Sequence, residues 1–347
     1  MRRAVKMTAV VASAVLALSA AGCGGKKAST GGGGGSDGKK SLKVGLAYDV
    51  GGRGDKSFND AAYAGLQKVQ SELKLDVKDI EAKEGESDND KIQRLQLLAQ
   101  SGYNPVIAVG FAYSGSVAKV AKEMPDTKFA IIDDAAAVGD NIANLLFASE
   151  QGSYLVGVAA ALKTKTNNIG FVGGVDVPLI NTFQAGFEAG VKATNPKAKV
   201  QVKYLTQPPD FSGFGDPAKG KTAAAGMFDA GADIVFQVAG GSGGGVFEAA
   251  KAAGGKAIGV DSDQYLTADP KVKDVIMTSM LKKVDVAVYD FITSVNDDKF
   301  TAGTTTYDLA KDGVGYATSG GQVDDIKTQL EDAKAKIISG EIKVPTK

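Results

Sequence analysis

Acidic, amide, hydroxyl and aromatic side chains gather directly after segments that the sequence predicts to be β-strands. The residues at these strand ends are Asp49, Ser57, Phe58, Asn59, Asp133, Gly240 and Asp261. Carboxylates and amides hydrogen-bond to hydroxyl groups, and a phenyl ring packs against a flat, poorly hydrated face. In α/β proteins, ligands bind beyond the carboxyl ends of the strands. We therefore expect these side chains to form one binding site for a small polar ligand.

Each of these features also has a purely structural interpretation. Asp133 and Asp261 could cap following helices, which is a common use of Asp after a strand. Phe58 could form a hydrophobic staple, and the glycines of residues 240–245 could form a permissive loop. The convergence of several strand ends favours a binding site more than any single feature does.

Composition excludes most catalytic machinery. The 347 residues include no His and one Cys, so a Ser-His-Asp triad, a Cys-His dyad, a His-bearing zinc site and an internal disulfide cannot form. We expect no cofactor and no metal. The 40 Lys and Arg residues balance the 40 Asp and Glu residues, which argues against a nucleic-acid partner because such partners need a basic stripe.

Two nucleotide-binding patterns occur out of context. Residues 215–222 match G-x-x-x-x-G-K-[ST], and residues 129–133 are similar to a Walker B strand. A P-loop must lie directly between a strand and a helix, but residues 207–214 separate this one from its predicted strand. The glycines of residues 240–245 lack a third Gly at Val246, so a dinucleotide site is also disfavoured.

From residue 42 onward, short apolar strands alternate with amphipathic helices. The predicted strands are residues 42–48, 105–109, 129–132, 169–172, 200–205, 234–238 and 257–260, and the predicted helices include 60–73, 154–162, 182–193, 219–228 and 246–253. Ser57 or Asn59 is expected to cap the first helix. This pattern predicts an α/β protein with parallel sheets covered on both faces, and the number of units favours two sheets.

The N-terminal residues indicate export and anchoring. Arg2, Arg3 and Lys6 precede an uncharged apolar stretch, residues 7–21, which is typical of a signal peptide. Residues 18–23 resemble a bacterial lipobox ending in Cys23, although Ala20 occupies the usual Leu position. The alternative is an ordinary secretory signal with an incidental Cys.

We therefore predict a signal peptide over residues 1–22 and a lipidated Cys23 at the head of a flexible Gly-rich tether, residues 23–41. Two acyl chains anchor a protein stably in a membrane. The predicted location is the extracytoplasmic face of the cell membrane.

Several motifs together resemble the basic membrane protein family, which includes the purine nucleoside receptors of bacterial ABC importers. They are Asp49-Val50-Gly51-Gly52, Asp55-Lys56-Ser57-Phe58-Asn59, Asp216-Pro217-Ala218-Lys219-Gly220, Gly259-Val260-Asp261-Ser262-Asp263-Gln264 and Thr278-Ser279-Met280-Leu281-Lys282. The resemblance implies a type I periplasmic-binding-protein-like fold, with two doubly wound parallel-sheet lobes joined by a hinge. The lobes it implies are residues 42–148 plus 264–295, and residues 149–263 plus 296–347.

The same resemblance implies how the base of a nucleoside is held. Phe58 looks like one aromatic wall for the nucleobase. Asn59, Asp49 and Asp133 would hydrogen-bond to the edge of the base. Ser57 belongs to the same signature and is included among the ligand-binding residues.

The resemblance also assigns the sugar and the second wall. Asp261 and Lys282 would hold the ribose hydroxyls, and Gly240 would allow close approach of the backbone. Phe214 is the favoured second aromatic wall, and Phe183 is its rival. The spacing of Phe183 in its predicted helix also fits a buried stripe.

The leading hypothesis is a monomeric, lipid-anchored nucleoside receptor whose partners are the membrane subunits of an ABC importer. The first alternative keeps the fold but binds a simple sugar or another small polar metabolite. A nucleoside-processing enzyme using Asp133 or Asp261, a transcription regulator and a surface adhesin are further alternatives. Because no His is present and the carboxylates suit hydrogen-bond acceptance, a binding protein is favoured over an enzyme.

Overall fold

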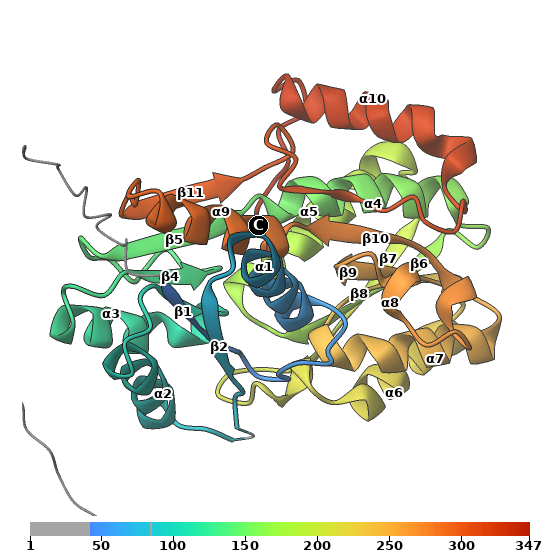
Figure 1. Ribbon diagram of the computed structural model, residues 1–347. Coiled ribbons are helices and arrows are strands. Elements are labelled where there is room, and N and C mark those ends of the chain that lie inside the picture. Colours follow the sequence, from blue (N-terminus) through green and yellow to red (C-terminus); the bar gives the residue numbers. More distant parts are fainter. Residues whose placement is uncertain (1–41, 84) are drawn as a thin grey trace, which may run out of the picture. The chain divides into compact units, whose positions relative to one another are not determined.

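The computed structural model describes residues 42–83 and 85–347. Its first sheet has the order β2-β1-β3-β4-β5-β11, and every neighbouring pair is parallel (Figure 1). The strands are β1 (Lys43–Ala47), β2 (Asp76–Ile80), β3 (Val106–Ala108), β4 (Phe129–Ile132), β5 (Ile142–Phe147) and β11 (Gly303–Tyr307). Their central members are apolar and fully buried, as parallel strands covered on both faces must be.

The second sheet repeats this order as β7-β6-β8-β9-β10-β12, with only the last pair antiparallel. Its strands are β6 (Asn168–Val175), β7 (Lys199–Thr206), β8 (Ile234–Val238), β9 (Lys256–Asp261), β10 (Ile276–Lys282) and β12 (Val314–Tyr316). The predicted fold class is confirmed: two mostly parallel α/β sheets, each doubly wound.

Helices flank both sheets. They are α1 (Phe58–Leu73), α2 (Asp88–Gln100), α3 (Ser114–Glu123), α4 (Ser149–Lys163), α5 (Pro178–Thr194), α6 (Pro217–Asp229), α7 (Gly243–Ala253), α8 (Gln264–Thr267), α9 (Val284–Asn296) and α10 (Lys327–Ile338). Short 3₁₀ turns η1 (Phe111–Tyr113), η2 (Ser212–Phe214) and η3 (Gly240–Ser242) follow strand ends. In α5, Phe183, Phe187 and Val191 are buried at helical spacing, as the sequence predicted.

The start of α1 differs from the prediction. Neither Ser57 nor Asn59 caps the helix; instead the Asp55 carboxylate accepts hydrogen bonds from the backbone N–H groups of Ser57 (2.9 Å), Asn59 (2.8 Å) and Asp60 (3.1 Å). The hydroxyl of Ser57 points elsewhere and donates to Asp261. Asp55 therefore fixes the first turn of α1 and leaves the Ser57 hydroxyl for a contact with the other sheet.

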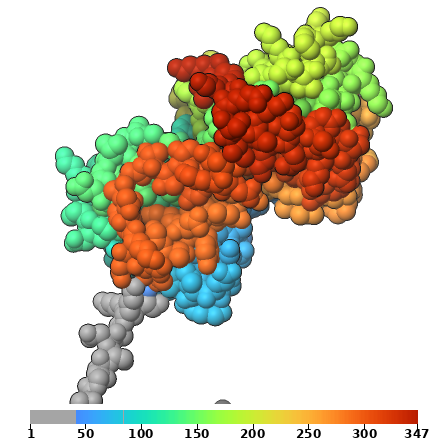
Figure 2. Space-filling model, turned by 90° about the horizontal axis from the view of Figure 1, so that it is seen from above, coloured from blue at the N-terminus to red at the C-terminus, as the bar shows by residue number. Residues whose placement is uncertain are grey.

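The expected boundaries between the lobes need correction. Strand β10 belongs to the second sheet, whereas β11 pairs with β5 in the first, and α9 packs closely on α1. Figure 2 shows the orange surface of α9 and β11 beside the green residues of the first sheet. Residues 264–282 thus lie with the second sheet and residues 284–307 with the first. The sequence motif at the end of β10 carried no sheet assignment. Both crossovers were therefore predicted one strand too early, before β10 instead of after it and before β11 instead of after it.

The P-loop look-alike forms no phosphate cradle. Asp216 caps α6 by accepting a hydrogen bond from the Lys219 backbone N–H at 3.0 Å. The Lys219 ammonium lies 3.9 Å from Asp210 and 3.7 Å from Asp216. These residues therefore serve the start of the helix.

The predicted signal peptide, Cys23 and the tether lie outside the described residues. Within the described part of the chain, no helix has both the length and the apolar character needed to cross a bilayer.

Candidate functional site

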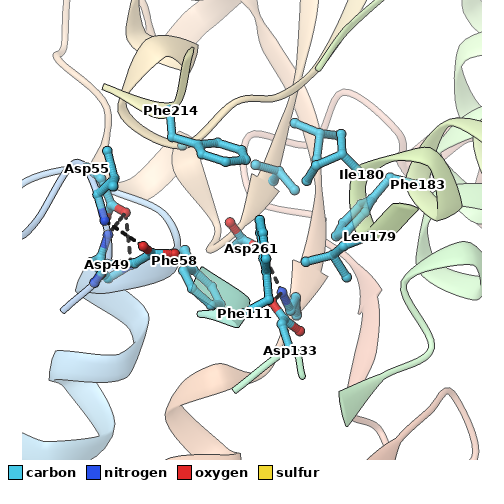
Figure 3. Close-up of a pocket in the computed structure, with 16 residues that line it drawn as sticks. Asp49, Asp55, Phe58, Phe111, Asp133, Leu179, Ile180, Phe183, Phe214 and Asp261 are labelled. Atoms are coloured by element: carbon cyan, nitrogen blue, oxygen red, sulfur yellow. Dashed lines mark hydrogen bonds and ion pairs between the residues drawn. The ribbon is translucent and has the colours of Figure 1, made fainter. Parts of the chain in front are cut away.

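A cavity is lined by strand ends and helix starts of both sheets (Figure 3). The first sheet and its connections contribute Asp49, Val50, Asp55, Phe58, Asn59, Phe111 and Asp133; the second contributes Leu179, Ile180, Phe183, Phe214, Val238, Gly240, Val260, Asp261 and Lys282. The cavity therefore lies where the carboxyl ends of parallel strands meet, as the fold requires.

A buried charged cluster occupies one part of the cavity. Lys282, the last residue of β10, forms an ion pair with Asp133, and its Nζ lies 4.0 Å from Oδ1 of Asp261. All three side chains are almost fully buried. Burial raises the pKa of both Asp133 and Asp261, while the Lys282 ammonium acts in the opposite direction. The cluster holds two carboxylates around one cation, so it keeps acceptor capacity for hydroxyl groups.

The two carboxylates occupy equivalent places in the two sheets. Asp133 follows β4 and Asp261 ends β9, and each strand is fourth in its sheet when counted from β2 or β7. Both residues adopt left-handed backbone conformations, with φ of 64° and 63°. Asp tolerates this region better than most residues do. Neither carboxylate caps a helix, so the structural alternative for these residues is wrong.

Aromatic rings line the rest of the cavity. The Lys282 Nζ lies 4.5 Å from the centre of the Phe58 ring and 5.7 Å from that of Phe183. Phe214 enters from the opposite side, at the end of η2 (Figure 3). Phe183 is also part of the core, since only 2 % of it is exposed. Both candidates for the second wall therefore reach the cavity, and Phe183 combines this with a packing role.

Asp49 forms a second polar region. Its Oδ1 accepts a hydrogen bond from the Val50 N–H at 2.8 Å; Oδ2 accepts none of the hydrogen bonds formed among the described residues. Burial raises the pKa of Asp49 to about 7. Near neutral pH this carboxyl is therefore present in both ionised and neutral forms.

Asn59 lines the cavity but is mainly engaged with its neighbours. Its Oδ1 accepts from the Asp49 backbone N–H at 3.0 Å, and its Nδ2 donates to Asp55 Oδ2 at 3.1 Å. Burial raises the pKa of Asp55 to about 6. Asn59 thus connects the end of β1 to the start of α1.

Gly240 lines the cavity at the end of β8. Its φ is +54°, and a Cβ atom built on it would lie 3.1 Å from the carbonyl oxygen of Phe214. A side chain at this position would therefore combine backbone strain with crowding against the Phe214 loop.

Direct hydrogen bonds join loops of the two sheets beside the cavity. The Ser57 hydroxyl donates to Asp261 Oδ2 at 2.6 Å, and the Ser262 hydroxyl donates to the Ser57 carbonyl at 3.1 Å. Gln264 Nε2 donates to the carbonyl of Lys56 at 3.0 Å. Ser57 itself does not line the cavity, so its role is contact between the loops.

Of the sequence-predicted ligand-binding residues, the structure places all but Ser57 in the lining of this one cavity, and Ser57 contacts Asp261 beside it. Sequence reasoning missed Phe111 and the side chains Leu179 and Ile180 at the start of α5. Phe111 follows β3 and the α5 residues follow β6, so the strand-end rule that selected the others applied to them too. Among residues 42–83 and 85–347, no cluster of three or more His, Cys, Asp or Glu side chains is suited to a metal ion.

Comparison with known proteins identifies the family. Residues 42–347 match the family model Bmp, described as ABC transporter substrate-binding protein PnrA-like. The chain is 38% identical over 324 residues to a CD4+ T-cell-stimulating antigen of Listeria monocytogenes, with 89% of each chain covered. It is 35% identical over 331 residues to the ABC transporter nucleoside-binding protein BmpA of Lactococcus lactis, covering 89% of this chain and 90% of that protein.

A solved structure agrees with these relatives. The crystal structure of an ABC transporter solute-binding protein from Aeropyrum pernix superposes with a TM-score of 0.76 at 31% identity, covering 88% of this chain and 94% of that one. The matched family and this neighbour are substrate-binding proteins rather than enzymes. The chain therefore belongs to the Bmp family of PnrA-like ABC transporter substrate-binding proteins.

Proposed function

We propose that this substrate-binding protein captures purine nucleosides outside the cytoplasm and delivers them to an ABC importer. The observation that carries the proposal is the single cavity in which aromatic rings lie beside a buried Asp133–Lys282–Asp261 cluster. A nucleoside has the matching pair of features, a flat base and a polyhydroxylated sugar. The Lactococcus lactis relative, which bears the name of a nucleoside-binding protein, supports the same ligand class.

The base is assigned to the space between Phe58 and Phe214. Stacking of a base on an aromatic ring contributes about 1–3 kcal/mol in nucleic-acid sites. Asp49 lines the same cavity with Oδ2 available, so its carboxylate can accept hydrogen bonds from donors on the edge of a base. A purine offers the larger face, and guanine offers two adjacent donors to one carboxylate.

The sugar is assigned to Asp261 and Lys282. A buried carboxylate can accept hydrogen bonds from both hydroxyls of a cis-diol, and removing one hydroxyl would leave part of the site unpaired. The ion pair between Asp133 and Lys282 supports assigning Asp133 to this end of the cavity instead of to the base edge. Gly240 lets the Phe214 loop approach the sugar end closely.

Closure around the ligand is assigned to the loops that carry these residues. Asp261 accepts a hydrogen bond from Ser57 across the two sheets and lines the cavity at the same time. Ligand binding and contact between the sheets therefore depend on the same carboxylate, which favours hinge closure on the ligand. A monomeric receptor in this closed form would be the species that the importer's membrane subunits engage.

Anchoring is assigned to Cys23. Its place after an apolar, uncharged stretch fits diacylation at a new N-terminus, and residues 24–40 would serve as the tether. Fractionation and acyl labelling of cells expressing the full chain test this. Wild type should carry the acyl label and be in the membrane fraction, and Cys23→Ala should lose the label. Acyl labelling that is unchanged in Cys23→Ala would contradict the assignment.

Calorimetry on purified residues 24–347 tests the ligand class. The panel comprises guanosine, adenosine, inosine, cytidine, guanine and ribose. The proposal predicts that purine nucleosides bind more tightly than cytidine, free base or pentose, and that they are recovered uncleaved. Binding of pentoses without nucleosides would favour a sugar receptor, and release of free base would favour an enzyme.

A further inference from the structure

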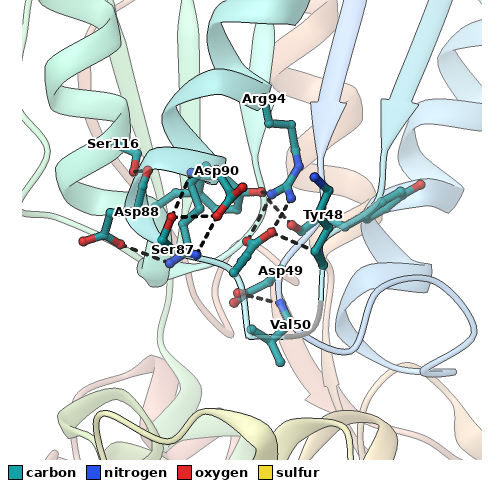
Figure 4. A network of polar contacts seen from close by, with 12 residues as sticks. Tyr48, Asp49, Val50, Ser87, Asp88, Asp90, Arg94 and Ser116 are labelled. Atoms are coloured by element: carbon teal, nitrogen blue, oxygen red, sulfur yellow. Dashed lines mark hydrogen bonds and ion pairs between the residues drawn. The ribbon is translucent and has the colours of Figure 1, made fainter.

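We propose that Arg94 is a positioning residue for recognition of the base: with Glu86 and Tyr113 it holds the peptide group that presents Asp49 to the cavity. The inference rests on the proposed function and names the part of the protein that sets preference among purines. These side chains come from α2, η1 and the loop before α2. They are linked through the Tyr113 hydroxyl to the Tyr48 carbonyl, and Figure 4 shows Arg94 near Tyr48 and Asp49.

The peptide group between Tyr48 and Asp49 is held on both sides. Its carbonyl oxygen accepts a hydrogen bond from the Tyr113 hydroxyl at 2.8 Å. Its N–H donates to Asn59 Oδ1 at 3.0 Å. Both partners are buried, so the peptide plane is fixed at the point where β1 ends and the binding loop begins.

Arg94 holds Tyr113 in turn. Its Nη1 donates to the Tyr113 hydroxyl, which leaves that hydroxyl's own proton for the Tyr48 carbonyl. Both Nη groups of Arg94 also donate to the carboxylate of Glu86. The side chains of Arg94 and Glu86 are only 5% and 2% exposed. A planar, bidentate pair of this kind fixes the direction of the guanidinium in a way that an ammonium cannot.

The same network reaches a second wall of the cavity. Tyr113 ends η1, the short turn that begins with Phe111, and Phe111 lines the cavity. Gly110, just before η1, lies so close to Asp49 that a Cβ built on it would fall 2.1 Å from Oδ2. The end of β1 and the start of η1 are therefore packed as one unit, with Arg94 behind both.

The Arg94–Glu86 ion pair bears on the site through the peptide that it holds by way of Tyr113. Lys91, Glu86 and Asp133 are the charged groups that influence Asp49, and Tyr113 also faces it. Among the described residues, Lys91, Glu86 and Asp133 form no hydrogen bond to the Tyr48 carbonyl, so they cannot replace the one from the Tyr113 hydroxyl. Losing that link should affect hydrogen bonding to the base while leaving the sugar cluster unchanged.

Tyr113→Phe is the direct test because it removes one hydroxyl and keeps the ring. Arg94→Lys is the second variant, because it keeps the positive charge beside Glu86 but not the planar guanidinium that bonds Glu86 through two nitrogens. Tyr316→Phe is the matched control, since it removes a Tyr hydroxyl bonded to Glu331 at 2.6 Å outside the cavity lining. Each is titrated calorimetrically with guanosine, 2′-deoxyguanosine and purine riboside, whose base edge has no donors.

In Tyr113→Phe and Arg94→Lys, guanosine affinity should fall about fivefold, the equivalent of one lost hydrogen bond of about 1 kcal/mol. Purine riboside affinity and the guanosine to 2′-deoxyguanosine ratio should each change less than twofold. Tyr316→Phe should leave all three unchanged. Equal loss for guanosine and purine riboside, or no loss for either, would overturn the inference.

Hydrogen exchange of the Asp49 backbone amide, followed by NMR, supplies a readout that needs no ligand. In wild type this N–H donates to Asn59 Oδ1 at 3.0 Å. Loosening of the peptide in Tyr113→Phe should speed its exchange, while Tyr316→Phe leaves the rate unchanged. Equal exchange rates in Tyr113→Phe and wild type would refute the positioning role. If wild type bound no purine nucleoside, the proposed function would fail, but this measurement would still decide the role of Tyr113.

Discussion

Replacing Asp261 with Asn probes the sugar end of the cavity at nearly constant volume. In the wild type, Oδ2 of Asp261 accepts from the Ser57 hydroxyl at 2.6 Å, while Oδ1 lies 4.0 Å from the Lys282 ammonium. An Asn that keeps the Ser57 bond turns its NH₂ group toward Lys282 and the sugar. One charged hydrogen bond to a ribose hydroxyl is then lost, which costs about 1.5–3 kcal/mol. Guanosine affinity should therefore fall roughly 10- to 150-fold.

The assay is calorimetric titration of Asp261→Asn with guanosine, 2′-deoxyguanosine and guanine. Guanine has no sugar, so its affinity should change by less than about threefold, and the preference for guanosine over 2′-deoxyguanosine should shrink. Asp140→Asn, at an exposed position outside the cavity lining, serves as the control and should bind like wild type. Equal losses for guanosine and guanine would refute the assignment of Asp261 to the ribose.

Three further outcomes follow from the site. Phe58→Ala and Phe214→Ala should each weaken guanosine binding by about 1–3 kcal/mol in calorimetry. Unchanged affinity in either variant would show that its ring does not stack on the base. Guanosine 5′-monophosphate should bind at least about 100-fold more weakly than guanosine, because Lys282 is the one cation among four carboxylates lining the described cavity; comparable affinity would contradict this charge argument. Burial raises the Asp49 pKa from 3.8 to about 7, so the folded state binds this proton more tightly than the unfolded state does. The free energy of unfolding therefore falls as pH rises from about 4 to 7. Asp49→Asn should accordingly raise the melting temperature more at pH 8 than at pH 5, and an equal rise at both would show that Asp49 titrates normally.

Hydrophobic patterning predicted the doubly wound sheets because most of their strands are short, apolar and buried. Strands β4 and β8 were predicted with their observed bounds. Strands β2 and β11 were missed, since their residues are largely polar and half-exposed or exposed at sheet edges. Strands β5, β10 and β12 were also missed, although β5 and β10 are mostly buried. The crossover order near β10 and β11 depends on which sheet a strand joins, a choice that local sequence does not encode.

Much of the candidate site was predictable because its residues follow strands in a parallel sheet. Asp133 and Asp261 could be selected this way, but their shared contact with Lys282 depends on how the two sheets face each other. The sequence identified Asp55 only as part of a motif. Its role as the cap of α1 depends on the backbone geometry of the preceding loop. Arg94 and Glu86 gave no signal in the sequence, because a buried ion pair eight residues apart looks like ordinary surface charge on a helix.

A crystal structure of the protein grown with guanosine would show directly how the base and the sugar are held. We expect the base between Phe58 and Phe214 with its donors on Asp49, and the ribose hydroxyls on Asp261 and Lys282. Guanosine bound with its sugar at Asp49, or bound outside this cavity, would refute both assignments.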